Sequence, residues 1–149
     1  MKEVSIGAAA KATGVKVPTI RYYEEVGLLP PIPRTDSNRR LYGERDLDRL
    51  RFIRHAREFG FEVTAIRALL DLQSKPDTSC TSVDIIAREH LAEVDRRVAS
   101  LQALKRELLR MIRSCGRQRV SDCRIIEALQ NHDQCQNREL ARTSRRSGD

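Results

Sequence analysis

The stretch of sequence that decides this fold is VPTIRYYEEVGLLP, residues Val17 to Pro30. Pro18 suits the first turn of a helix, where its missing N–H group costs nothing, and Gly27 is the residue expected just past a helix end. Hydrogen-bond donors and aromatic rings of the kind that reach phosphates and base edges lie between them: Thr19, Arg21, Tyr22 and Tyr23. The stretch therefore predicts a short DNA-reading helix that stops at Gly27.

The segments on either side of this helix predict a winged helix-turn-helix. Residues Ile6 to Ala12 are alanine-rich and helix-forming, and Thr13-Gly14 breaks that helix before the next one begins. After Gly27 three prolines prevent a helix, and Arg40 to Tyr42 is a potential short strand between polar turn residues. The spacing of helix, tight turn and second helix is that of a DNA-binding helix-turn-helix, and the loop after it predicts a small β-wing.

Two further helices are predicted after the wing, at about Glu44 to Glu58 and Val63 to Leu72. Their apolar residues recur at helical spacing: Leu47, Leu50, Ile53, Ile66, Leu69 and Leu70. These helices are expected to close a compact core over the first two. The sequence thus predicts a mainly α, winged helix-turn-helix domain over residues 1–74, and the composition of SKPDTS predicts a hinge over residues 75–82.

One long helix is predicted over residues 83–114. Its apolar residues recur every three or four positions: Leu91, Val94, Val98, Leu101, Leu104, Leu108 and Met111. A helix of roughly 30 residues is about 45 Å long, and a single stripe along it cannot bury itself. We expect a second copy of the chain to cover the stripe in a homodimer, because the apolar residues of the N-terminal domain are committed to its own core. Packing against that domain is the alternative.

Composition and charge narrow the classes of function. The 149 residues carry a formal charge of +7, which favours a polyanionic partner, although the excess is spread over both halves of the chain. No apolar run approaches the roughly 20 residues that span a bilayer, and the N-terminus lacks the apolar core of a signal peptide, so we expect a cytoplasmic protein with no membrane partner. No nucleophile stands with a base at catalytic spacing, which disfavours an enzyme.

The chain resembles the MerR family of transcription regulators, from about residue 4 to residue 129. The resemblance is carried by Ile20-Arg21-Tyr22-Tyr23-Glu24, Gly27-Leu28-Leu29-Pro30, the wing residues Arg34, Arg40 and Tyr42, then Leu47, Leu50, Ile53 and Gly60-Phe61. The wing departs from the family pattern, because it reads Asn38-Arg39-Arg40 where a Gly-Tyr-Arg-like sequence is usual. The guanidinium of Arg39 stands in the place of an aromatic ring, and a guanidinium can also contact a phosphate.

The resemblance implies a homodimer that is joined by an antiparallel coiled coil and binds double-stranded promoter DNA. Such regulators activate transcription by bending and untwisting promoters whose two recognition elements are too far apart for RNA polymerase. The resemblance implies DNA contacts by Arg21 and Tyr22 on the recognition helix and by Arg40 in the wing, with Thr19 and Tyr23 as weaker candidates. Adjacent helical positions point about 100° apart, so we expect only one of the two tyrosines to face the groove.

Three of the four cysteines flank the long helix. Cys80 lies at its start, Cys115 at its end, and Cys123 eight residues later across a polar loop. In the antiparallel dimer that the resemblance implies, Cys80 of one subunit meets Cys115 and Cys123 of its partner. Three thiolates suit soft or borderline ions, so a metal effector is predicted, with a metal-binding loop and short helix over residues 115–130. Small buried thiols are the alternative reading.

The resemblance also bears on which metal is sensed. A cysteine at position 80 is the mark of sensors for cadmium, lead, zinc or mercury, whereas copper(I) sensors carry a serine there. Zinc usually takes a fourth ligand, for which His132 and Cys135 are candidates. They lie at the start of a tail, residues 131–149, that is predicted to be disordered. We therefore expect a divalent ion to activate a promoter for metal efflux or resistance.

Two alternatives stay open: a copper(I) sensor that uses Cys115 and Cys123 alone, and a regulator that responds to thiol oxidation. A sensor of organic ligands is disfavoured, because the region after the long helix is short and holds no Phe, Tyr or Trp. An iron–sulfur sensor is disfavoured as well, because it needs a tight run of four cysteines.

Overall fold

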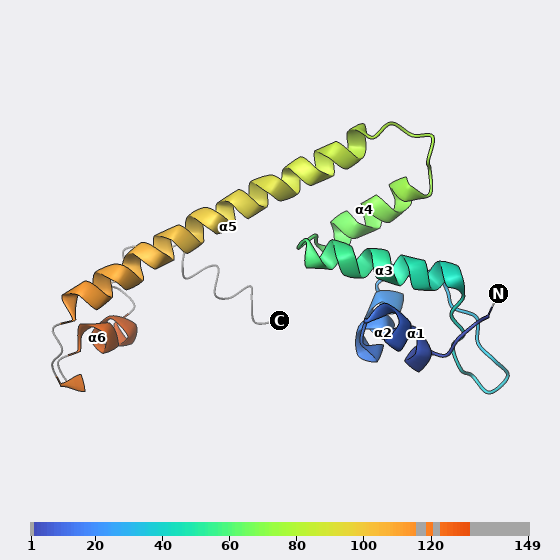
Figure 1. Cartoon of the computed structure of the whole chain (residues 1–149), viewed down its shortest axis with the longest axis horizontal. Coiled ribbons are helices and arrows are strands. Elements are labelled where there is room, and N and C mark those ends of the chain that lie inside the picture. Colours follow the sequence, from blue (N-terminus) through green and yellow to red (C-terminus); the bar gives the residue numbers. More distant parts are fainter. Residues whose placement is uncertain (1, 116–118, 121–122, 132–149) are drawn as a thin grey trace. The chain divides into compact units, whose positions relative to one another are not determined.

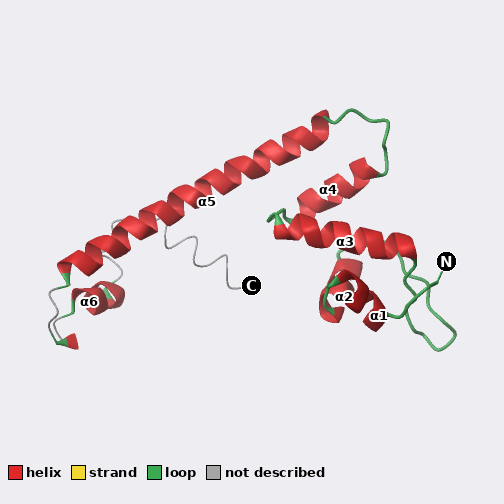
Figure 2. Cartoon of the chain, viewed as in Figure 1, coloured by secondary structure: helices red, strands yellow, loops and turns green. Residues whose placement is uncertain are grey.

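The computed structural model describes residues 2–115, 119–120 and 123–131 (Figure 1). Over these residues the chain is mainly α, with no regular strand among them (Figure 2). The six helices of this part are α1 (Ile6–Thr13), α2 (Val17–Glu25), α3 (Glu44–Glu58), α4 (Val63–Gln73), α5 (Thr81–Ser114) and α6 (Arg124–Gln130). Each predicted helix is therefore present. The chain divides after Ile86 into two compact units, so the division falls inside α5, just beyond the predicted hinge.

Helices α1 and α2 form the helix-turn-helix. The Ser5 side chain caps α1 by accepting a hydrogen bond of 3.3 Å from the Ala8 N–H. Gly14 ends α1 in the left-handed conformation with φ 73°, and α2 begins three residues later at Val17 with Pro18 in its first turn. The predicted turn at Thr13-Gly14 is confirmed, and the recognition helix α2 that follows it lies at the surface.

Gly27 ends α2 by the hydrogen-bond pattern of a Schellman motif. Its φ is 76°, the Gly27 N–H donates to the Glu24 carbonyl at 3.2 Å, and the Leu28 N–H donates to the Tyr23 carbonyl at 2.9 Å. The reversal places Leu28 and Leu29 in the core. The expectation that the helix stops at Gly27 is confirmed.

We expect Gly14→Ala to lower the free energy of unfolding by about 1–3 kcal/mol, because a side chain at positive φ is strained. A Cβ at Gly14 also clashes with Nη1 of Arg54, the atom that donates to the Thr13 carbonyl at 2.9 Å. Urea denaturation monitored by circular dichroism measures the change. Gly7→Ala is the matched control, since nothing lies within 4 Å of its Cβ position inside α1 and the substitution there raises helix propensity.

The wing is a tight loop held by single bridges. Antiparallel bridges join Arg34 to Arg40 and Val4 to Tyr42, and Asn38 turns the tip with a φ of 63°. The expected short strand at Arg40 to Tyr42 is therefore wrong as a regular strand. The physical reason is local: three prolines just before the wing lack N–H donors, so a continuous ladder cannot form. Asn38 takes the left-handed place that glycine usually fills, which asparagine tolerates better than most residues.

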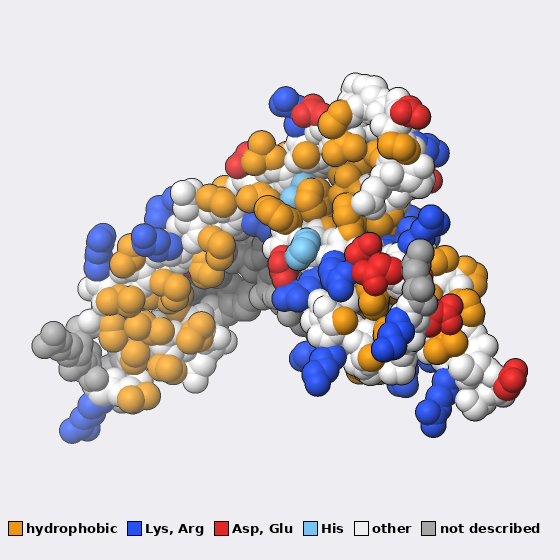
Figure 3. All heavy atoms as spheres, turned by 45° about the vertical axis from the view of Figure 1, so that its right-hand side comes forward, with side chains coloured by type: hydrophobic (Ala, Val, Ile, Leu, Met, Phe, Trp, Pro, Cys, Tyr) orange, Lys and Arg blue, Asp and Glu red, His pale blue; other side chains and the backbone are white. Residues whose placement is uncertain are grey.

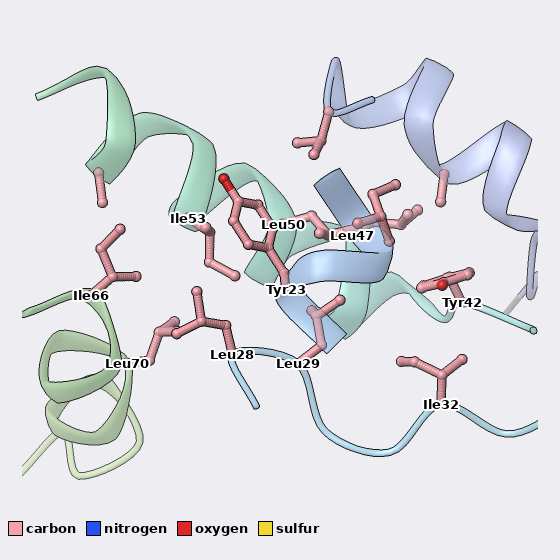
Figure 4. Packing of buried hydrophobic residues seen from close by; sticks show 14 residues of the cluster. Tyr23, Leu28, Leu29, Ile32, Tyr42, Leu47, Leu50, Ile53, Ile66 and Leu70 are labelled. Atoms are coloured by element: carbon pink, nitrogen blue, oxygen red, sulfur yellow. The ribbon is translucent and has the colours of Figure 1, made fainter. Parts of the chain in front are cut away.

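The core of the first unit is built by α1 to α4 together with the segment that leads into the wing (Figure 4). Tyr23 and the leucines that follow α2 face apolar side chains of α3 and α4 in this view. Full burial of each large aliphatic or aromatic side chain stabilises the folded state by about 1.5–3 kcal/mol relative to leaving it exposed. The buried apolar residues are Ala9, Val15, Ile20, Tyr23, Leu28, Leu29, Ile32, Tyr42, Leu47, Leu50, Ile53, Ala56, Ile66 and Leu70.

Helix α5 contrasts with this core, because none of its 34 residues is buried. Large apolar side chains along it, between 37% and 64% exposed, are Ile85, Leu91, Val94, Val98, Leu101, Leu104, Leu108, Leu109 and Ile112. Figure 3 shows such side chains gathered in patches on the molecular surface. The predicted apolar stripe is present and is largely exposed within the described part of the chain, where its last residue, Met111, is half-buried. No helix in that part is long and apolar enough to cross a membrane.

Candidate DNA interface and thiol site

The recognition helix α2 turns two of its predicted DNA-contacting side chains outward. Arg21 is exposed, Tyr22 is 47% exposed, and Thr19 is half-buried. Tyr23 is only 7% exposed and lies in the core, where burial raises its pKa. Just one of the two tyrosines therefore offers its ring to a ligand, which agrees with the angular separation of neighbouring helical positions.

Arg40, the wing residue predicted to contact DNA, lies beside Glu24 of the recognition helix. Its Nε is 2.7 Å from Oε2 of Glu24, close enough for an ion pair, although the angles are not those of a hydrogen bond. Tyr42 is fully buried, and its hydroxyl has no hydrogen-bond partner among the described residues. Burial, followed by the nearby Glu24 carboxylate, raises the pKa of Tyr42. The contact between Arg40 and Glu24 has no local sequence signal, because one residue lies in the wing and the other in α2.

Three arginines that contribute to the net positive charge of the chain stabilise helix ends. A guanidinium that donates to a carbonyl near a helix C-terminus satisfies an orphan acceptor and opposes the negative end of the helix dipole. Arg54, Arg49 and Arg67 donate in this way to the main-chain carbonyls of Thr13, Leu28 and Val26, respectively. These three cations are therefore structural, which the sequence analysis missed.

A shallow basic pocket of about 360 Å³ opens beside the start of α2. Its lining includes Lys16, Thr19 and Tyr23, together with Arg54, Arg57 and the carboxylate Glu58 from α3. Lys16 is the N-cap of α2 and makes no side-chain cap hydrogen bond, and Pro18 in the first turn has no N–H group. The positive end of a helix with the Lys16 cation beside it suits a DNA phosphate. Arg54 is engaged by Thr13 and Glu58, and Arg57 donates to the Phe61 carbonyl.

Two of the predicted metal-binding thiols lie together in the second unit. Cys115 directly follows α5, where its N–H donates to the Met111 carbonyl at 3.0 Å, and Cys123 is the N-cap of α6. Their Sγ atoms are 3.6 Å apart, and neither cysteine is in a disulfide. The backbone N–H of Ile126, followed by the Cys115 thiol and the N–H of Ile125, lowers the pKa of Cys123. A thiol with a lowered pKa ionises more readily, and the thiolate is the metal-binding form.

The separation of the two sulfurs fits a shared metal ion. Two sulfurs bound to one tetrahedral ion at about 2.3 Å stand about 3.8 Å apart, whereas a disulfide requires about 2.05 Å. The measured Sγ–Sγ distance between Cys115 and Cys123, 3.6 Å, is close to the first value and far from the second. The pair thus supplies two soft donors in a geometry that a borderline or soft ion accepts.

The third predicted ligand, Cys80, is exposed in the first unit and directly precedes α5. Within the described residues of one chain no group of three or more His, Cys, Asp or Glu side chains could hold a metal. Other parts of the predicted site lie outside the described residues: loop positions 116–118 and 121–122, together with His132, Cys135 and the basic tail. One chain therefore brings together two of the three predicted thiols.

Comparisons with known proteins agree with this arrangement of elements. Residues 4–73 match the family model described as MerR HTH family regulatory protein, and residues 47–111 match the model described as MerR, DNA binding. The chain is 42% identical over 128 residues to the transcriptional regulator ZntR of Escherichia coli strain K12, covering 84% of this chain and 91% of that protein. It is 41% identical to heavy metal-dependent transcription regulator 2 of Rhizobium meliloti strain 1021, covering 86% of this chain and 87% of that protein.

A solved structure shows the same fold. The transcription regulator PbrR691 from Ralstonia metallidurans CH34, in complex with lead(II), is 38% identical, with a TM-score of 0.73. The similarity covers 85% of this chain and 98% of that one. From its sequence, its helices and these matches, the chain belongs to the MerR family of helix-turn-helix transcription regulators, and is accordingly a DNA-binding regulator and not an enzyme.

Proposed function

We propose that this regulator responds to a soft divalent metal ion that is held by Cys80, Cys115 and Cys123. The observation that carries the proposal is the pair of cysteines beyond the end of α5, with sulfurs 3.6 Å apart and a lowered pKa at Cys123. Relatives whose names or bound ions refer to heavy metals support it: the Rhizobium meliloti regulator and the lead(II)-bound PbrR691.

The third thiol is proposed to come from a second copy of the chain. The apolar stripe of α5, largely exposed within the described part of the chain, supports a homodimer through an antiparallel coiled coil. In that arrangement the start of one α5 lies beside the end of the other, so Cys80 of the partner subunit joins Cys115 and Cys123. Three thiolates carry a formal charge of −3, which one divalent ion largely offsets.

A site shared between subunits couples metal ligation to DNA shape. The thiols that hold the ion belong to two chains, so the relative arrangement of the chains, and of their recognition helices, depends on ligation. Deforming a promoter of this length costs on the order of 1–6 kcal/mol. A metal ion whose binding free energy favours the activating arrangement of the dimer by a similar amount shifts the equilibrium toward the deformed DNA. RNA polymerase then reaches both elements of a promoter for metal efflux or resistance.

The DNA contacts are proposed on the exposed side of α2. Arg21 and Tyr22 reach into the groove from this side, and Thr19 lies at the edge of the basic pocket, where a phosphate can bind. Tyr23 can add at most its edge to that pocket, because its ring is in the core. Arg40 is engaged by Glu24.

Cadmium and lead fit the proposed ligand set better than zinc. The sequence between Cys115 and Cys123 contains no histidine to serve as a fourth ligand for zinc. We expect the reduced protein to bind cadmium or lead at one ion per subunit, and Cys80→Ser to lose this tight binding. Anaerobic titration with cadmium, lead, zinc and copper(I), monitored by thiolate-to-metal absorption in the ultraviolet, measures both. If Cys80→Ser binds as well as the parent and copper(I) outcompetes every divalent ion, the protein is a copper sensor instead.

A thiol-redox response is the second candidate, and the proximity of Cys115 to Cys123 favours it. Hydrogen peroxide can oxidise the two thiols to a disulfide and is itself reduced to two molecules of water. Transcription that is activated by peroxide in the absence of any metal would support this candidate and contradict the metal proposal.

A further inference from the structure

The contact between Glu24 and Arg40 joins two parts of the DNA-binding surface, the recognition helix and the wing. We propose that Arg40 is a positioning residue, which holds the wing to α2 through Glu24, and that it is not a phosphate contact. The inference deepens the proposed DNA interface and rests on it. It changes the role that the sequence analysis assigned to Arg40.

The pair is shielded from water more than an ordinary surface ion pair. The side chains of Arg40 and Glu24 are 25% and 19% exposed, and their charged atoms are 2.7 Å apart. Removing one partner from such a pair leaves the other charge without compensation in a partly desolvated place, which is costly. The buried hydroxyl of Tyr42 lies close enough for the Glu24 carboxylate to raise its pKa. The polar groups therefore form one cluster at the base of the wing.

Few backbone hydrogen bonds hold the wing in place, so the side-chain contact between Arg40 and Glu24 matters for its position. Val4 and Tyr42 exchange two backbone hydrogen bonds of 2.9 and 2.8 Å, and a single bridge pairs Arg34 with Arg40. Neither of these contacts reaches α2. The contact from Arg40 to Glu24 does reach α2. It adds to the packing of Ile32 and Tyr42 in the shared core, and so contributes to the angle between the wing and the recognition helix.

The electrostatics of Glu24 separate a positioning role from a phosphate contact. A carboxylate beside a DNA phosphate repels it, so a guanidinium that binds phosphate gains when a neighbouring carboxylate is neutralised. If Arg40 contacts phosphate, Glu24→Gln leaves DNA affinity unchanged or raises it. If Arg40 positions the wing, the same substitution lowers affinity, because the wing is released. The two roles thus predict effects of opposite sign.

We expect Glu24→Gln to lower affinity for operator DNA about tenfold in the full-length protein. Fluorescence anisotropy with a labelled operator duplex, repeated at several salt concentrations, measures the affinity and its salt dependence. Glu25→Gln is the matched control: Glu25 is the exposed neighbour on α2, and its loss changes the net charge equally. Equal or tighter binding by Glu24→Gln, as expected for Glu25→Gln, overturns the proposal.

Two further variants distinguish a specific effect on the wing from a general loss of folding. Glu24→Asp keeps the charge and shortens the side chain by one methylene, so a phosphate-contact role for Arg40 predicts unchanged binding and the positioning role predicts a loss. Arg40→Gln should weaken binding while the slope of log affinity against log salt stays that of the parent. A slope reduced by about 0.9 indicates a lost phosphate contact and contradicts the proposal. Circular dichroism of each variant verifies that its helices are intact.

Discussion

Replacing Leu101 by glutamate should produce a folded but monomeric protein that no longer binds an operator with two half-sites. Leu101 lies in the middle of the α5 stripe and is 64% exposed in the single chain. In a symmetric dimer the substitution removes two buried leucines, at about 1.5–3 kcal/mol each, and places two carboxylates in an apolar seam. Losing the second subunit also removes the second recognition helix, so affinity should fall by orders of magnitude.

Light scattering gives the molar mass of the variant, and anisotropy with the operator duplex gives its affinity. The control is Gln102→Glu, which adds the same charge at the neighbouring exposed position outside the stripe and should remain dimeric. The N-terminal core should be unaffected, because α5 contributes no buried residue to it. A Leu101→Glu protein that stays dimeric and binds DNA would contradict the proposed coiled coil.

Cys123→Ser should abolish the response of transcription to metal while leaving operator binding intact. A serine hydroxyl is a hard, neutral donor, so we expect affinity for cadmium or lead to fall by at least about 100-fold. DNA binding should persist, because Cys123 lies in the second unit and the helix-turn-helix lies in the first. Transcription in vitro with RNA polymerase, with and without the metal, measures the response.

Cys135→Ser is the matched control for this experiment, since it removes the remaining cysteine of the chain, which is not among the three proposed ligands. A normal response in this variant and none in Cys123→Ser supports the three-thiolate site. A full metal response in Cys123→Ser would exclude that site, and its loss in both variants would add Cys135 to the ligands.

The sequence predicted the helices well because their ends carry local signals. Pro18 in the first turn and Gly27 just past the last one bracket α2, and Gly60 ends α3 at a φ of 85°. Family resemblance added the order of the elements. The wing was predicted less well: prolines and an asparagine in the left-handed conformation replace a regular strand by single bridges.

The parts of the site that escaped prediction depend on contacts between distant segments. Nothing near Arg40 in the sequence reveals that Glu24 is its partner, and nothing near Arg54 reveals that it caps the end of α1. The thiols were easier, because Cys115 and Cys123 are only eight positions apart in the sequence. Their Sγ–Sγ distance of 3.6 Å nevertheless has no local signal in the sequence. A third ligand from another subunit is a property of the assembly, and it stays a prediction.

The lack of buried residues in α5 ties the stability of the regulator to its abundance. A helix that buries nothing within the described part of its own chain draws its tertiary stabilisation from association, so its melting temperature should rise with protein concentration, whereas the N-terminal core should melt independently of it. On dilution the subunits dissociate, and the long helix then unfolds before the DNA-binding domain does. The number of copies in a cell therefore sets, by mass action, what fraction of the chains can bind the effector at all.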